Sequence, residues 1–550
     1  MSLTKPTISP TMQQWVAAGI ILLIALYTYG ALAQKVVFDS RTWLDEVNYL
    51  IKSWWYVTGR VTPYTDQDPT WYMPLYFYEL GWWQQVFGQG HLSGRLLSVL
   101  LGGLNGLLLF KICRKLTGNV VVAALAVLMF LSTPATVFYF ATANPIASVS
   151  FLHLACIWLI LTKAKQPNLL ASIALGAMFC TLYFFRQNMI LSIIVLYPTY
   201  IIMLKDQRLK HFFCIAITSL VCCVSIMLTH SARMMDYVIR LPVVSEILGK
   251  LGLLPASLET VLSGTTTPYS LGFEFTQIRI EDVLNAFVLP YGGTLLLTIV
   301  LLCIAVRGNR WLWTLPAYFF FLAVSHYMGS VGYCATCVLA YTNYYISIGV
   351  LAASIPLCIL WQQGGNSLPA SLTLTVSSTL LVVGINTFAS GLATVDEYRS
   401  YPEPMLRQVR PLSQLEDINK FSVFVRENTN PGKPVLIIHS LSGLPYAVFK
   451  ADRIFPVQNI NPLQSYRQLK KGLSKTQETA VMAALDKEGL WTDDLLERWA
   501  ASTYDTVIFQ EGLKTEVGSV PEILSEQFDL TESSSYRGWN IRLFERKQPN

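Results

Sequence analysis

The sequence predicts a multi-pass α-helical membrane protein with about eleven transmembrane helices and a C-terminal soluble α/β domain. Two observations lead to this fold class. The 550 residues are 53% hydrophobic and only 13% charged, against about 25% charged in an average soluble domain. Apolar runs long enough to cross the hydrocarbon core, about 20 residues each, recur through the first 390 residues and then stop. We therefore expect a membrane domain over residues 1–395 and a soluble domain over residues 396–550.

The apolar runs define the expected transmembrane helices. They cover residues 15–34, 93–112, 119–138, 146–162, 168–184, 188–204, 211–230, 284–306, 311–328, 337–361 and 368–391. We interpret the first run as a helix that stays in the protein, because it is long enough to span and lacks the small-residue motif of a cleavage site.

The orientation of these helices follows from their short loops, since Lys and Arg gather on the cytoplasmic side. Basic residues follow the second, fourth, sixth and eighth helices: Lys111, Arg114, Lys115, Lys163, Lys165, Lys205, Arg208, Lys210, Arg307 and Arg310. All of these loops fall on one side. The pattern predicts a cytoplasmic N-terminus and three long outer segments, residues 35–92, residues 231–283 and the chain after about residue 392.

The tail has the composition of a small α/β domain. Residues 435–439, 506–509 and 539–544 predict strands, the last of them in a closing antiparallel pair, and residues 476–485 and 493–501 predict helices. No glycine-rich phosphate loop stands at a strand-to-helix junction, so we expect no nucleotide-sugar or ATP site here. The net charge of +6 indicates no nucleic-acid partner, because basic residues of a membrane protein mostly set its topology.

An acidic pair, Asp45 and Glu46, follows the first helix. It opens a predicted amphipathic helix, rich in Trp and Tyr, that we expect at the membrane interface. Its apolar residues are Trp43, Leu44, Tyr49, Leu50, Trp54 and Trp55. Two adjacent carboxylates there are candidates for general acid–base chemistry. The competing interpretation is that the two acids only interact favourably with the dipole of the helix, which stabilises the helix by about 0.3–1 kcal/mol.

The order of motifs in this region resembles the GT-C superfamily of membrane glycosyltransferases, above all the bacterial aminoarabinose transferases and the protein O-mannosyltransferases. The motifs are DExxY (Asp45, Glu46 and Tyr49), the aromatic segment YMPLYFY with Tyr72 and Tyr76, and GRLLS over residues 94–98 before a basic turn. The resemblance implies a GT-C-like fold for the whole chain, with Asp45 as the catalytic base and Glu46 as its neighbour. It also implies Tyr49, Tyr72 and Tyr76 as substrate-binding residues.

A sugar donor linked to a polyprenyl phosphate needs cations beside its phosphate. An Arg at the membrane edge is energetically costly, so its presence there suggests a function. Arg186, in LYFFRQNMI, and Arg95 are the candidates, since a guanidinium forks onto phosphate oxygens. Snorkelling is the other interpretation of Arg186, and helix packing is the other interpretation of Arg95. His326 and Tyr345, towards the outer ends of their helices, are further candidates for substrate binding, although a lone His is more often a hydrogen-bonded core residue.

Cofactor use is left open by the sequence. The resemblance implies a second acid in the next outer loop, but residues 133–150 contain none, so no metal ligands are predicted and a divalent cation lacks support. The Arg-Tyr pair that the resemblance implies late in the chain appears as Tyr344 and Tyr345.

We therefore expect an inverting glycosyltransferase of the bacterial inner membrane, with its C-terminal domain in the periplasm. Its partners would be membrane lipids, a polyprenyl-phosphate sugar donor and an extracytoplasmic glycan, lipid or protein acceptor. The outer loop 231–283, with a centre rich in Ser, Thr and Gly, is a candidate lid. Two alternatives remain, a transporter or flippase for a lipid-linked or small substrate, and a non-catalytic partner with the GT-C fold.

Overall fold

The computed structural model of the chain divides into two compact units. The first comprises residues 1–40, 94–223 and 274–409, and the second comprises residues 41–93, 224–273 and 410–550. Within them the structure describes residues 10–39, 44–61, 73–204, 206–230, 313–330, 337–363, 413–438, 444–455, 504–510, 528–536 and 539–547. The predicted spans 284–306 and 368–391, the candidate lid 231–283 and the predicted helices 476–485 and 493–501 lie outside these residues.

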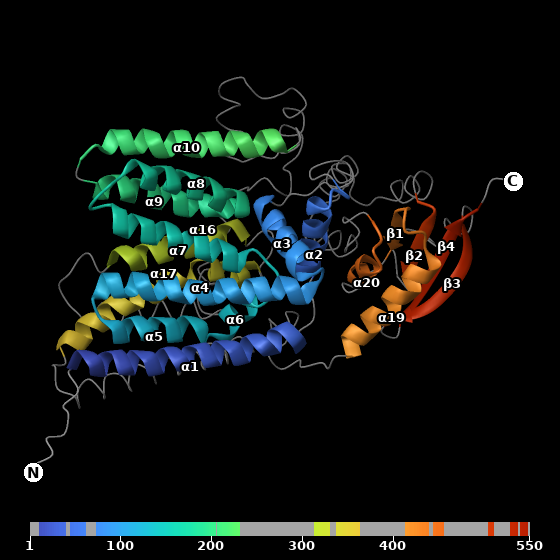
Figure 1. The fold of residues 1–550 in the computed structure, drawn as a ribbon, viewed down its shortest axis with the longest axis horizontal. Coiled ribbons are helices and arrows are strands. Elements are labelled where there is room, and N and C mark those ends of the chain that lie inside the picture. Colours follow the sequence, from blue (N-terminus) through green and yellow to red (C-terminus); the bar gives the residue numbers. More distant parts are fainter. Residues whose placement is uncertain are drawn as a thin grey trace, which may run out of the picture. The chain divides into compact units, whose positions relative to one another are not determined.

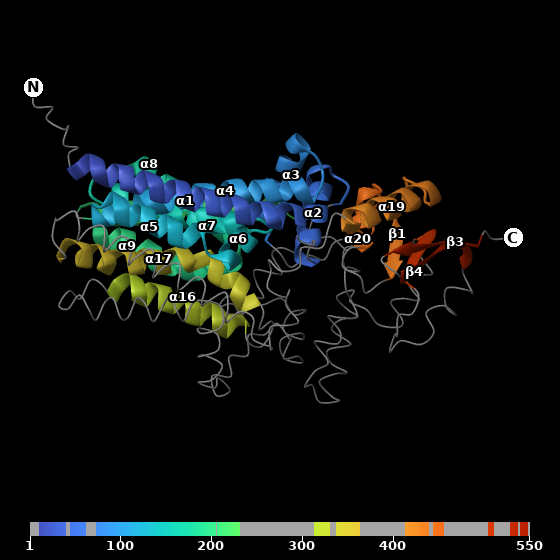
Figure 2. The same cartoon turned by 90° about the horizontal axis from the view of Figure 1, so that it is seen from below.

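The first unit is a helical bundle whose long helices run side by side (Figures 1 and 2). Its elements are α1 (Pro10–Asp39), α4 (His91–Thr117), α5 (Val120–Leu131), α6 (Pro134–Phe140), α7 (Ile146–Lys163), α8 (Leu169–Phe185), η1 (Gln187–Met189), α9 (Ile190–Met203), α10 (Arg208–Thr229), α16 (Thr314–Ser330) and α17 (Cys337–Gln363). Four of the described helices are long and apolar enough to cross a membrane: Met12–Phe38, His91–Thr117, Ile146–Lys163 and Arg208–Thr229. The chain is therefore an integral membrane protein, as predicted.

One span that was predicted as a single helix is two helices in the structure. Residues 119–138 were expected as a single helix, but α5 ends at Leu131 and α6 begins at Pro134. Pro134 disfavours the helical conformation of the residue before it, and Thr133 is extended (φ −75°, ψ 113°). The Thr133 hydroxyl donates to the Met129 carbonyl at 2.8 Å, so the break leaves this helix end capped. A proline inside an apolar run, here about three-quarters of the way along it, is the signal for such a break.

Small residues allow α4 to pack closely in the bundle. A Cβ at Gly102 would lie 2.0 Å from the Tyr29 hydroxyl of α1 and 3.2 Å from Phe140 of α6. One turn later, a Cβ at Gly106 would lie 3.0 Å from Leu131 of α5. Glycines four residues apart are a common device for close helix contact in membranes, where burial of apolar surface does not drive association.

Helices α8 and α10 run in the same direction. Near their starts, Ser172 hydrogen-bonds to His211 at 2.7 Å, and further along, Cys223 donates to Cys180 with 3.3 Å between the sulfur atoms. From the first contact to the second, the residue number increases in α8 and also in α10, so the two helices are parallel. The predicted topology requires this relation, because it makes them the fifth and seventh spans.

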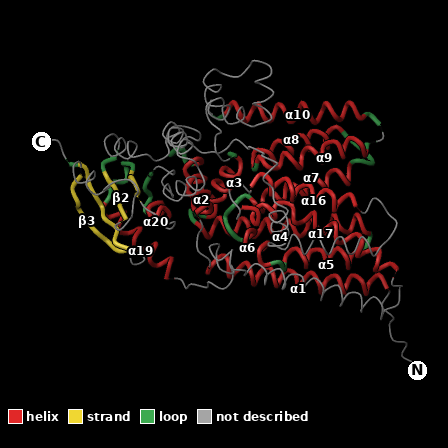
Figure 3. Tube along the Cα trace, turned by 180° about the vertical axis from the view of Figure 1, so that it is seen from behind, coloured by secondary structure: helices red, strands yellow, loops and turns green. Residues whose placement is uncertain are grey.

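The second unit contains helices α2 (Leu44–Val57), α3 (Leu75–Phe87), α19 (Ser413–Asn428) and α20 (Leu444–Lys450) and a four-stranded sheet, seen in yellow in Figure 3. The strands β1 (Val435–Ile438), β2 (Thr506–Gln510), β3 (Phe528–Tyr536) and β4 (Trp539–Arg546) have the order β1-β2-β4-β3. β1 and β2 are parallel, and β4 pairs antiparallel with β2 and β3. The strands predicted at 435–439, 506–509 and 539–544 thus correspond to β1, β2 and β4.

Strand β3 was not predicted. Its sequence FDLTESSSY buries only its first and last residues, Phe528 and Tyr536, and exposes most of the others. Tyr536 packs on Phe421 of α19, with 5.3 Å between the ring centroids. A strand anchored only at its two ends has neither the apolar run nor the alternation that identifies strands in a sequence.

Candidate functional site

Helix α2 carries the predicted acidic pair in its first turn. It begins at Leu44, one residue before Asp45, and buries Val47, Leu50 and Ile51 on one face. Glu46 is 2% exposed and therefore lies inside the protein. The side chain of Asp45 lies outside the described residues, so its catalytic role stays a prediction. The amphipathic helix expected at this position is present, and it holds one acid of the pair in a place shielded from solvent.

Tyr49 and Tyr76 are brought together by the packing of α2 against α3. Their ring centroids are 5.2 Å apart at an interplanar angle of 84°, and Phe77 lies 5.5 Å from Tyr49. Both tyrosines are buried, at 6% and 1% exposure. The structure therefore gives their rings a packing role, and substrate binding stays a prediction for both. Tyr72 lies outside the described residues.

A buried amide fixes α3 on α2. The Gln84 side chain, which is fully buried, donates to the Leu50 carbonyl at 3.1 Å and to the Ser53 hydroxyl at 2.7 Å. Its amide oxygen accepts a hydrogen bond from the Gly90 N–H at 3.0 Å. The helices cross at Gly81, where a Cβ would lie 2.3 Å from the Ser53 carbonyl oxygen. The position of α2 therefore depends on a glycine in α3.

We expect Gly81→Ala to lower the free energy of unfolding by about 1–3 kcal/mol, because the added methyl group would force two backbones apart. Thermal unfolding of the detergent-solubilised protein measures this loss. Gly103→Ala is the matched control, since a Cβ at Gly103 meets nothing within 4 Å. Alanine within a helix is intrinsically favoured over glycine by about 0.5–1 kcal/mol. Equal melting temperatures for the two variants would contradict the close crossing.

Arg95 closes the C-terminal end of α1. Its side chain is fully buried, and Nη1 donates to the carbonyl oxygens of Val36 and Val37, both at 2.9 Å. These carbonyls belong to the last turn of α1, where a helix lacks intrahelical partners and favours a cation. Helix packing was expected from the sequence as the alternative role of Arg95, but the capping of α1 by Arg95 was not predicted. The phosphate-binding role of Arg95 stays a prediction.

Arg95→Ala should lower the free energy of unfolding by about 1–3 kcal/mol, the cost of leaving buried polar groups without a partner. Arg95→Lys should lose less, because one ammonium group can still reach the helix end. The matched control is Arg208→Ala, because exposed Arg208 donates to the Leu204 carbonyl at the end of α9, at 2.7 Å. Solvent replaces that bond, so thermal unfolding should barely change. A loss of carrier binding by Arg95→Ala without any loss of stability would assign the guanidinium to phosphate instead.

Arg186 lies where α8 ends and η1 begins. Its backbone N–H donates to the Leu182 carbonyl at 3.1 Å, and its carbonyl accepts from the Met189 N–H at 3.0 Å. The residue is extended (φ −155°, ψ 114°) and half-buried. The backbone of Arg186 therefore makes hydrogen bonds on both sides of the junction between the two helices. Its binding to phosphate stays a prediction.

The remaining candidates lie in α16 and α17. Tyr345 is 1% exposed and packs its ring 5.8 Å from that of Phe319. His326 belongs to α16, but its side chain lies outside the described residues. A different histidine, His153 of α7, is fully buried and hydrogen-bonds to Tyr318 of α16 at 2.9 Å. It is a hydrogen-bonded core histidine of the kind that the sequence alone does not distinguish from a functional one.

The C-terminal residues of the second unit contact α2 through aromatic rings. Trp55, near the end of α2, lies 5.1 Å from Phe455 and 6.4 Å from Phe449, both at steep angles, and all three side chains are at most 2% exposed. Trp55 was expected at the membrane interface, but the structure buries it against protein. Such ring pairs contribute about 0.5–1.5 kcal/mol each beyond the area they bury.

Two polar contacts flank these rings. Arg60 donates to Asp452 at 2.5 Å, and Tyr446 accepts a hydrogen bond from the His91 N–H at 2.8 Å while contacting His91 Nδ1 at 2.9 Å. The hydrogen bond from Arg60 lowers the pKa of Asp452. The side chains of Arg60 and Asp452 are 31% and 56% exposed, and an ion pair so open to solvent contributes only about 0.2–1 kcal/mol. The ring contacts are therefore expected to contribute more to the packing of α2 than the ion pair.

Among the described residues, no three His, Cys, Asp or Glu side chains gather as metal ligands. The divalent cation that the sequence left open therefore receives no candidate site from this part of the chain.

Part of the chain is similar to a known protein family. Residues 68–230 match the family described as dolichyl-phosphate-mannose-protein mannosyltransferase. The likeness is to a glycosyltransferase family, and the matched segment, which is less than half of the chain, runs from residue 68 to just beyond the end of α10. A search of curated proteins by sequence finds no match.

Two solved structures of ArnT from Cupriavidus metallidurans are similar to this chain. The apo structure has a TM-score of 0.53 at 12% identity and covers 97% of this chain and 98% of that chain. The structure bound to undecaprenyl phosphate has a TM-score of 0.52 at 13% identity, covering 96% and 98%. At this identity the likeness shows the fold alone. The resemblance to GT-C membrane glycosyltransferases, predicted from the sequence, is confirmed.

Proposed function

We propose that this chain is an inverting glycosyltransferase that moves a sugar from a polyprenyl-phosphate carrier to an extracytoplasmic acceptor. The observation that carries the proposal is the acidic pair in the first turn of α2, in a chain whose residues 68–230 match a mannosyltransferase family. ArnT, whose fold this chain shares, was solved with bound undecaprenyl phosphate, which supports the choice of carrier.

In the proposed reaction, the acceptor hydroxyl attacks the anomeric carbon as the bond from that carbon to the carrier phosphate oxygen breaks. Asp45 takes the hydroxyl proton, and the bonding electrons leave with the phosphate. A single displacement inverts the anomeric centre and needs no covalent sugar intermediate. Arg186, with Arg95 as a second candidate, would stabilise the charge that gathers on the leaving phosphate.

We further propose that α2 and the C-terminal domain lie outside the cytoplasm, in the periplasm of a bacterial cell. The basic loops predict this orientation, and two structural observations support it. The parallel course of α8 and α10 fits the predicted parity of the spans. In the second unit, the described residues of the first outer loop and of the tail pack together, as expected for segments in one compartment.

The experiment uses the full chain in lipid nanodiscs, supplied with undecaprenyl-phosphate sugars and with glycan, lipid and peptide acceptors. We expect release of undecaprenyl phosphate coupled to a new glycosidic bond of inverted configuration, measured by mass spectrometry and NMR. Movement of intact carrier across a vesicle bilayer, without cleavage, would indicate a flippase instead. Carrier binding with neither cleavage nor movement would indicate a non-catalytic partner.

A further inference from the structure

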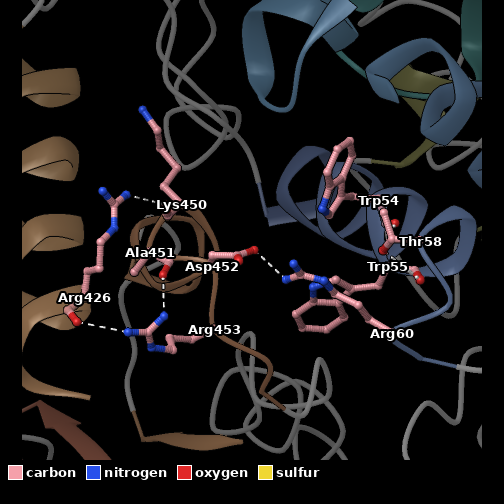
Figure 4. A network of polar contacts seen from close by, with 9 residues as sticks. All are labelled: Trp54, Trp55, Thr58, Arg60, Arg426, Lys450, Ala451, Asp452 and Arg453. Atoms are coloured by element: carbon pink, nitrogen blue, oxygen red, sulfur yellow. Dashed lines mark hydrogen bonds and ion pairs between the residues drawn. The ribbon is translucent and has the colours of Figure 1, made fainter. Parts of the chain in front are cut away.

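Helix α2 ends in a turn that directs Arg60 away from the helix axis. Gly59 has a positive φ of 69°, and the N–H groups of Thr58 and Arg60 donate to the carbonyls of Trp54 and Trp55, both at 3.0 Å. The Thr58 hydroxyl also donates to the Trp54 carbonyl at 2.7 Å. Glycine adopts this left-handed conformation without steric cost, so the end of α2 is sharply defined. The guanidinium of Arg60 points from this end to Asp452 (Figure 4).

Helix α20 ends in a similar turn, but with Asp452 where glycine is usually found. Asp452 has a φ of 64°, a conformation that favours glycine. Its N–H donates to the Phe449 carbonyl at 2.9 Å. A glycine would adopt this turn more easily, but only a side chain with an acceptor can bind Arg60. The sequence therefore places a carboxylate at a strained position that faces the end of α2.

Arg453 anchors the backbone next to that carboxylate. It is 3% exposed, and its guanidinium donates to the carbonyls of Arg426, Thr429 and Ala451 at 2.8–2.9 Å and to the Thr429 hydroxyl at 2.7 Å. Figure 4 shows the bonds to Arg426 and Ala451, which join the C-terminal ends of α19 and α20. Because Arg453 follows Asp452 directly, the backbone that presents the carboxylate is anchored from inside the C-terminal domain.

We propose that the end of α20 is a clamp that positions α2, and with it the Asp45–Glu46 pair. The clamp consists of Trp55 between Phe449 and Phe455, with Arg60 bound to Asp452. Trp55 lies ten residues after Asp45, about 15 Å along a rigid helix, so a shift or rotation of the clamped end is carried to the acids. A displacement of about 1 Å in a catalytic group can cost about a hundredfold in rate. The proposal rests on the proposed function and assigns the C-terminal domain a positioning role in it.

The test compares Asp452→Asn, Arg60→Gln and the double variant in the full chain. Asparagine tolerates the left-handed conformation, so the turn is kept while the charge is lost. We expect amide hydrogen exchange in α2 to become several-fold faster in each single variant. The double variant should be no worse than either single variant, because the two residues act through each other. In the transfer reaction, kcat should fall several-fold while the KM for the carrier stays unchanged.

Glu416→Gln is the matched control. Glu416 forms an exposed ion pair with Lys420 at 2.8 Å within α19, and its loss should change neither exchange nor kcat. Unchanged exchange in α2 for both clamp variants would overturn the proposal, even if the chain proves to be a glycosyltransferase. Faster exchange in a chain without transferase activity would sustain the contact but refute the proposed function, so the two failures can be told apart.

Discussion

Asp45→Asn should lower the turnover of sugar transfer by about 10²–10⁴-fold, the contribution expected of a general base. The amide matches the carboxylate in shape but does not accept a proton at neutral pH. Because Asp45 stands in the first turn of α2, the loss of one charge there should leave the helix in place. Carrier binding and the melting temperature should therefore stay close to those of the unchanged protein. Initial rates of undecaprenyl phosphate release measure the effect.

Two further variants separate catalysis from general charge effects. Asp45→Glu keeps the carboxylate but moves it by about one methylene. This variant should retain part of the transfer rate, because its base is misplaced rather than absent. Asp529→Asn removes an acid from β3 with a side-chain exposure of 71%, and it should change nothing. Near-normal transfer by folded Asp45→Asn would refute the assignment of the base. Glu46 would then be the next acid to test, because it follows Asp45 directly in the sequence and its side chain is buried.

Local signals predicted much of the fold. Long apolar runs and basic loops identified the helices of the bundle, since a membrane span must satisfy its own backbone hydrogen bonds. Runs of β-branched residues identified β1 and β2, and the Trp- and Tyr-rich stretch identified α2. The break before Pro134 was missed although its signal was in the sequence. Strand β3 was missed because its exposed polar residues carry no pattern of burial.

The contacts around α2 were beyond the reach of a single sequence. Arg60 and Asp452 are 392 positions apart, and neither has a sequence signal that names its partner. Trp55 was read as an interfacial residue because Trp is common at membrane surfaces, but tertiary packing decides which aromatic residues meet. The capping of α1 by Arg95 has the same origin, since it depends on how two helices lie side by side. Glycine at position 59 and aspartate at position 452 indicate where helices end, but they do not indicate which residues those helix ends contact.

Arg186→Ala should weaken the binding of undecaprenyl phosphate by about a hundredfold, if the guanidinium donates one or two hydrogen bonds to the phosphate. Bonds to a charged group contribute about 1.5–3 kcal/mol each, and about 1.4 kcal/mol corresponds to a tenfold change in affinity. The junction of α8 and η1 should survive, because the backbone of Arg186, rather than its side chain, donates to Leu182 and accepts from Met189. Affinity is measured by titrating the carrier phosphate, without sugar, into the protein in nanodiscs.

Two further variants distinguish phosphate binding from snorkelling at the membrane edge. Arg186→Lys keeps the charge but loses the planar fork of the guanidinium. Its affinity for the carrier phosphate should therefore lie between those of the unchanged protein and of Arg186→Ala. Arg114→Ala is the matched control, because Arg114 is also a basic residue at a helix end, 4.8 Å from the ring of Trp15, and is predicted on the cytoplasmic side. It should bind the carrier normally. If Arg186→Ala and Arg114→Ala bind the carrier equally well, Arg186 only snorkels, and the cation for the leaving phosphate must be sought elsewhere, beginning with Arg95.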